Sequence, residues 1–80
     1  MSTPLRRRYG HAARRMTASE ILKAADARID YKALGLDVSD RRVFYDKRRR
    51  EWLVELNTDP ALYYVARRAS DGSIRLEREP

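Results

Sequence analysis

Apolar residues recur at three- and four-residue steps between residues 21 and 36, with charged residues between them. This spacing is typical of an amphipathic helix. Thr17 and Glu20 match a capping box, so the helix is expected to begin there. Gly35 favours the left-handed conformation that ends a helix, so the helix is expected to end near Leu34. The apolar positions are Ile21, Leu22, Ala25, Ile29, Ala33 and Leu36.

Beyond residue 40 the apolar residues alternate with polar ones, which is the period of half-buried β-strands. The segments that predict strands are residues 43–46, 52–56, 62–68 and 74–76. They are separated by the charged run 47–50, by residues 57–60 with Pro60, and by residues 70–73 with Gly72. These separators have the composition of turns.

A helix and a sheet that each have one apolar face must cover one another. The predicted fold is therefore α+β: one amphipathic helix packed on a three- to four-stranded antiparallel β-meander, with a flexible basic N-terminal arm. The arm is expected at residues 1–16 and a single domain at residues 17–80. In the third strand Tyr63 and Tyr64 point to opposite faces, and the pattern leaves open which face the helix covers. The expected core is Ile21, Leu22, Ala25, Ile29, Val43, Tyr45, Trp52, Val54, Leu56, Val65, Ile74 and Leu76.

Composition narrows the classes of function. Cysteine is absent and His11 is the single histidine, so thiolate chemistry and Cys/His metal sites are not expected. The sequence has no glycine-rich phosphate loop, nucleophile motif or metal-ligand spacing, so we expect neither an enzyme nor a bound cofactor or metal. No apolar stretch is long enough for a membrane span, and a cytoplasmic location is the default. Residues 1–19, with five arginines and no acid, leave a mitochondrial transit peptide as the alternative.

The net charge of +6 is segregated along the chain. Residues 1–15 contain five arginines and no acid, whereas the remainder has 13 basic and 12 acidic residues. Arginine outnumbers lysine fifteen to three, which suits bidentate contacts with phosphate. A genome rich in arginine codons would produce the same excess.

Two basic segments carry the first functional hypothesis, electrostatic binding of nucleic acid. In the arm, Tyr9 is placed to stack on a base while arginines bind phosphates. The charged turn, at a hairpin tip, is placed to enter a groove. Such contacts carry no base sequence information. The alternatives are a solubilising tail and a solvated turn. The candidate residues are Arg6, Arg7, Arg8, Tyr9, Arg14, Arg15, Lys47, Arg48, Arg49 and Arg50.

The second hypothesis is a protein-interaction module, such as an inhibitor or adaptor of the kind that phages and mobile elements encode. Its interface would be the exposed sheet face around Leu53, Tyr63 and Tyr64. Free edge strands would also permit a homodimer by strand pairing. The nearly neutral body favours this hypothesis and the arginine-rich segment favours the first, so the sequence leaves both open.

Overall fold

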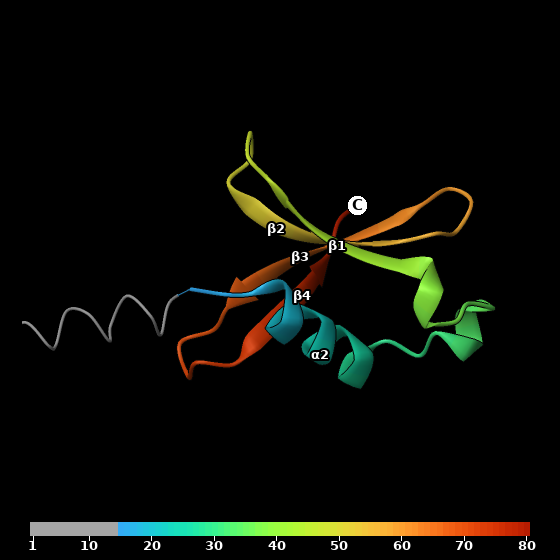
Figure 1. The fold of residues 1–80 in the computed structure, drawn as a ribbon, viewed down its shortest axis with the longest axis horizontal. Coiled ribbons are helices and arrows are strands. Elements are labelled where there is room, and N and C mark those ends of the chain that lie inside the picture. Colours follow the sequence, from blue (N-terminus) through green and yellow to red (C-terminus); the bar gives the residue numbers. More distant parts are fainter. Residues whose placement is uncertain (1–14) are drawn as a thin grey trace, which may run out of the picture.

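One helix packs on a four-stranded antiparallel sheet (Figure 1). The structure, a computed structural model, describes residues 15–80. The strand order β1-β2-β3-β4 follows the chain, so the α+β meander predicted from the sequence is confirmed with four strands. The expected arm lies, up to residue 14, outside the described residues. The elements are helix α2 (Ala18–Arg28), two 3-10 turns (Lys32–Leu34 and Val38–Asp40), and strands β1 (Arg41–Asp46), β2 (Glu51–Leu56), β3 (Leu62–Arg68) and β4 (Ile74–Arg78).

Helix α2 begins as predicted but ends earlier. The Thr17 hydroxyl accepts from the Glu20 amide at 3.2 Å, and the Glu20 carboxylate accepts from the Thr17 amide at 3.0 Å. The predicted end near Leu34 is wrong, because Ile29 already has extended backbone angles of −100° and 127°. Gly35 does adopt the left-handed conformation, with φ of 73°, but it ends the 3-10 turn Lys32–Leu34.

Tyr31 gives the physical reason for the early end of the helix. The chain leaves the helix at Ile29 and brings the Tyr31 ring into the core, where it is 9% exposed. The Tyr31 hydroxyl donates to the Asp26 carboxylate at 2.7 Å, and Arg41 binds both oxygens of that carboxylate. Burying the ring with its hydroxyl satisfied favours this path over continued helix.

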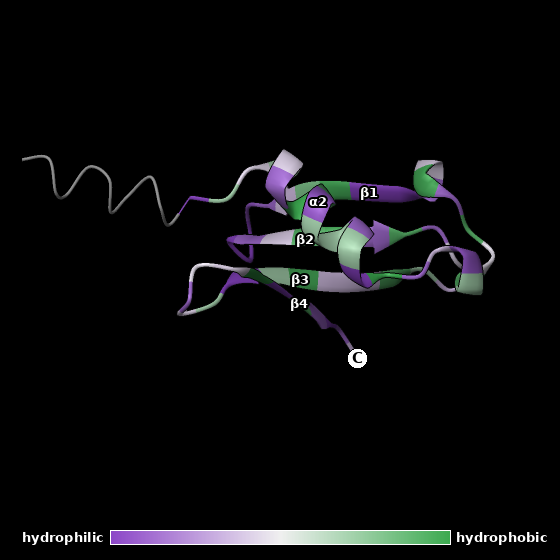
Figure 2. Ribbon diagram, turned by 90° about the horizontal axis from the view of Figure 1, so that it is seen from below, coloured by the Kyte–Doolittle hydropathy of each residue, from purple (hydrophilic) through white to green (hydrophobic). Residues whose placement is uncertain are grey.

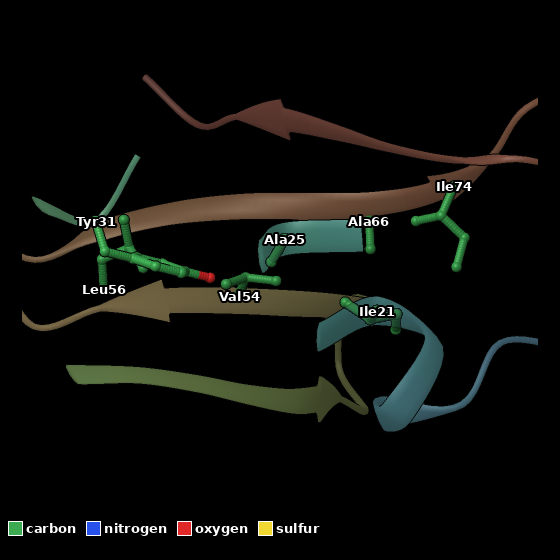
Figure 3. Close-up of a cluster of buried hydrophobic side chains, with 7 residues drawn as sticks. All are labelled: Ile21, Ala25, Tyr31, Val54, Leu56, Ala66 and Ile74. Carbon is green, nitrogen blue, oxygen red and sulfur yellow. The ribbon is translucent and has the colours of Figure 1, made fainter. Parts of the chain in front are cut away.

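The core lies between α2 and the sheet (Figure 3). Ile21, Val54 and Leu56 are fully buried there, as the sequence predicted. The prediction for Tyr45 was wrong, because 45% of that residue is exposed. The buried members of this core are Ile21, Ala25, Tyr31, Val54, Leu56, Ala66 and Ile74.

The strand register settles which face α2 covers. Val54 pairs with Tyr64, and both pack toward the helix. Leu53 pairs with Val65 and with Phe44, so these three share the opposite face. The predicted core residue Val65 is therefore buried on the face that α2 does not cover.

The surface of α2 is mixed in polarity, as the alternating purple and green of Figure 2 shows. Ile21 and Ala25 are buried, whereas Lys23 and Asp26 are exposed. Within residues 15–80, no helix has the length and apolar character needed to cross a membrane.

Charged side chains cover the sheet face opposite α2. Leu53 and Val65 are each 4% exposed, although no helix of the described chain lies over them. Phe44 on the same face lies under the Arg42 guanidinium, 4.7 Å from its ring centroid. Long charged side chains bury apolar surface with their stems while their heads stay in water. The apolar residues of this face are therefore shielded from water by charged side chains of the sheet itself.

Five ion pairs connect the strands across that face, among them Arg42 on β1 with Glu55 on β2. Arg67 on β3 binds Glu51 on β2 at 2.8 Å and Glu77 on β4 at 3.1 Å. Arg49, from the turn after β1, binds Glu51 at 3.0 Å and also binds Glu79, beyond β4. A twisted sheet brings two diagonal corners together over one face, which explains how the first turn meets the end of the chain.

Candidate nucleic-acid interface

The turn at residues 47–50 joins β1 to β2, as the sequence predicted. Asp46 and Glu51 form the last pair of the hairpin. The Asp46 carboxylate accepts from the backbone amides of Arg48 at 3.0 Å and Arg49 at 3.3 Å. These hydrogen bonds fix the backbone of the turn. Within residues 15–80, Asp46 forms no ion pair with the basic side chains of the turn.

The four basic side chains of the turn are all exposed, but they are not equivalent. Arg49 is held by Glu79 and Glu51, and its hydrogen bond with Glu79 raises the pKa of its guanidinium and lowers the pKa of Glu79. Lys47, Arg48 and Arg50 have no ion-pair partner in the described part of the chain. We call these three residues the tip cations.

Arg50 has a left-handed backbone, with φ of 56°. This conformation suits glycine, whereas the Cβ of another L-residue costs about 1–2 kcal/mol there. Strained backbone of this kind recurs at functional sites. The turn therefore keeps an arginine at the position where glycine would be favoured.

Arg68 places the start of the described chain at the same end of the sheet as the turn. Its guanidinium donates to the carbonyl oxygens of Arg15 and of Gly72, each at 2.7 Å. Arg68 adjoins Arg67, which binds Glu51 at the base of the 47–50 turn. Figure 1 shows the blue start of the described chain on the same side as this turn. Residues 1–14, with four more arginines, join the chain here.

The two ends of the sheet have opposite charge. The turns at residues 47–50 and 69–73 contain four cations and one acid, Asp71. The connecting segments at the other end, residues 29–40 and 57–61, contain four acids and one cation, Lys32. Such separation attracts a polyanion to one end and repels it from the other. The four acids are Asp30, Asp37, Asp40 and Asp59.

The sequence-predicted site residues fall into several places. Arg15 lies exposed at the start of the described chain, and the tip cations lie together at the turn. The three residues of the alternative protein interface do not form one surface. Tyr64 packs against the helix-side core, whereas Leu53 is buried on the other face. The remaining candidates, Arg6, Arg7, Arg8, Tyr9 and Arg14, lie outside the described residues.

Tyr63 shares the face of Leu53 but is tied to its own strand neighbour. Its hydroxyl donates to Glu55 at 3.0 Å, and this hydrogen bond raises the pKa of Tyr63. Glu55 also binds Arg42 at 2.6 Å. Tyr63 is therefore one member of an internal polar network rather than a free aromatic anchor.

Tyr45 is a surface residue that sequence reasoning missed. Its ring meets Trp52 edge to face, with centroids 5.4 Å apart and planes at 67°. Trp52 is half-buried and packs against the helix-side core. The alternation with Val43 assigned Tyr45 to the inner face, and only its nearness to the basic turn could have indicated its exposure.

Polar side chains line a hollow at the acidic end of the sheet. The hollow has a volume of about 350 Å³ and is lined by Ser39, Asp40, Arg41, Arg42, Glu55 and Asn57. Arg41 is already bound to Asp26, and Arg42 to Glu55. Among residues 15–80, no three His, Cys, Asp or Glu side chains gather in a way that could hold a metal ion.

The chemistry of the basic turn is the basis for interpreting the candidate nucleic-acid interface. Comparisons of the chain with protein-family models, with curated proteins and with solved structures gave no match.

Proposed function

We propose that this chain is a small non-enzymatic accessory or regulatory protein that binds nucleic acid electrostatically. The observation that carries the proposal is the group of three exposed tip cations on a fixed turn, none of which has an ion-pair partner within residues 15–80. They lie at the end of the sheet where the arginine-rich residues 1–14 join the described chain. Both basic segments of the sequence can therefore act on one ligand.

The binding mode follows from the charge arrangement. Lys47, Arg48 and Arg50 contact phosphates and release counterions from the nucleic acid. Arg49 supports the turn through Glu51 and Glu79 instead of contacting the ligand. The acidic connections at the far end direct the molecule so that its basic end meets the polyanion. Phosphate contacts alone do not select a base sequence.

The alternative, a protein interface on the sheet face, has weaker support. Leu53 is 4% exposed, and Tyr63 is hydrogen-bonded to Glu55. An aromatic anchor for a partner has to be accessible. Homodimerisation through the edge strands β1 and β4 is an outcome that the experiment below also registers.

Binding is tested by titrating the full chain against a labelled DNA duplex at several salt concentrations, with the oligomeric state measured in parallel. In the variant K47Q/R48Q/R50Q, the log-log salt slope for duplex binding should become shallower by about 2.7, because three phosphate contacts are lost. The matched control K23Q/R28Q/K32Q removes the same net charge from α2 and the following 3-10 turn. It should leave most of the slope in place.

Two results would contradict the proposal. One is that the intact chain binds no nucleic acid at low salt. The other is that both triple variants weaken binding equally, since net charge and not the tip would then control it. A dimer that binds no nucleic acid would favour the protein-interaction alternative.

A further inference from the structure

Tyr45 is exposed although it lies on the sheet face that packs against α2. Of the four tyrosines within residues 15–80, Tyr45 alone is exposed; Tyr31 is buried, and Tyr63 and Tyr64 are half-buried. It lies on β1, an edge strand of the sheet. An exposed ring on an edge strand is accessible to a flat ligand.

The ring of Tyr45 is held in position by the core. Trp52 pairs with Tyr45 in the strand register and contacts it edge to face at 5.4 Å. Trp52 itself packs against the buried residues beneath α2. A stacking surface that is already oriented binds with a smaller loss of conformational entropy.

The aromatic pair lies at the base of the basic turn. Lys47 follows Tyr45 by two positions, and Arg50 precedes Trp52 by two positions. The tip cations are thus separated from the exposed ring by one pair of the hairpin, Asp46 with Glu51. Positive charge and an accessible ring therefore lie within a few residues of each other at the same end of the hairpin.

We propose that the ligand is single-stranded nucleic acid and that an unpaired base stacks on Tyr45. This inference rests on the proposed function. Lys47, Arg48 and Arg50 bind the phosphates that flank this base. In a duplex each base is paired and stacked inside the helix, so its face is not available to a tyrosine ring. Proteins that bind single strands combine a basic surface with aromatic rings in this way.

Trp52 supplies a built-in reporter because it is the single tryptophan of the chain. The full chain is titrated with oligothymidylate, with a duplex and with inorganic polyphosphate, all carrying equal numbers of phosphates, while Trp52 fluorescence is recorded. Oligothymidylate should change the Trp52 emission through its contact with Tyr45, whereas polyphosphate should bind with little change.

Variants separate stacking from charge. Tyr45→Leu keeps an apolar side chain without a π face, and it should weaken oligothymidylate binding about 5- to 150-fold, the effect of losing one stacked base. Affinity for duplex and polyphosphate should not change. Tyr45→Phe keeps the stacking surface and should bind nearly as the wild type does. Val38→Ala, at an exposed apolar position at the acidic end, is the matched control.

The outcomes distinguish the two proposals. If the wild type binds all three polyanions and Tyr45→Leu weakens none or all of them equally, the single-strand inference is overturned and the electrostatic function stands. If the wild type binds none of them, both proposals fail. Circular dichroism of Tyr45→Leu and Tyr45→Phe shows whether each variant is folded. If the leucine variant is misfolded, two measurements on the wild type decide instead: the Trp52 response and the preference for single-stranded over duplex DNA.

Discussion

Arg49 and Glu79 form an ion pair that joins the turn after β1 to the end of the chain beyond β4. On the sheet face that carries Glu51, the second partner of Arg49, Leu53 and Val65 are almost completely shielded from water, each 4% exposed. The sheet thus has a helix on one face and a layer of charged side chains on the other.

Replacing Arg49 separates stability from binding. Arg49→Ala should lower the urea midpoint of unfolding, because it removes the two ion pairs that join the turn to β2 and to the segment beyond β4. Its salt slope for duplex binding should stay close to that of the wild type, since Arg49 offers no free charge. Arg48→Ala should behave in the opposite way, with an unchanged midpoint and a slope shallower by about 0.9. A slope change for Arg49→Ala as large as that for Arg48→Ala would refute this division of roles.

Arg50→Gly should stabilise the protein. Glycine removes the cost of the left-handed backbone but adds entropy to the unfolded chain, and the net gain is of order 1 kcal/mol or less. Arg48→Gly, in the same turn, has no such strain to relieve and should be destabilising. Chemical denaturation measures both, and binding should weaken in both. If the Arg50→Gly variant is no more stable than the Arg48→Gly variant, the backbone of Arg50 is not strained.

The helix-side core should be sensitive to truncation at Leu56. This residue is fully buried, so Leu56→Ala should cost about 2–5 kcal/mol. That cost is a large share of the roughly 5–15 kcal/mol available to a domain of ordinary stability. Leu34→Ala, at a position that is 42% exposed, should cost far less. Equal losses for the two variants would contradict a core that is centred on Leu56.

Tyr31 should make stability fall in strong alkali. Burial, and then its hydrogen bond to Asp26, raises the pKa of Tyr31 from 10.0 to about 12. The folded state therefore holds the phenol proton more tightly than the unfolded state does. The resulting stability is complete below pH 10 and is lost as the pH rises toward 12. Tyr31→Phe should remove this part of the pH dependence in urea unfolding curves; parallel curves for the two proteins would contradict it.

Local chemistry explains how far the sequence could predict the fold. Thr17 and Glu20 lie one helical turn apart, and the strands follow from alternation within a few residues, so both were predictable. The helix end was not, because Gly35 indicates a left-handed residue without indicating which helix it ends. Burial of Tyr31 depends on contacts with the sheet, which a local pattern does not contain.

The candidate site shows the same limit. The turn at residues 47–50 was predictable as a charged run between two alternating segments. The engagement of Arg49 was not, because Glu79 is 30 residues away. Alternation placed Tyr45 on the helix side of the sheet but gave no measure of how far the helix cover extends toward the edge strand.

The meander order has a kinetic consequence. Every strand pairs with the next strand along the chain, so each hairpin closes a short loop at small entropic cost. Folds dominated by such nearby pairings reach the native state faster than those that must join distant segments. We expect α2 to dock after the hairpins form, because its buried residues pack against Val54 and Leu56 on a strand of the assembled sheet.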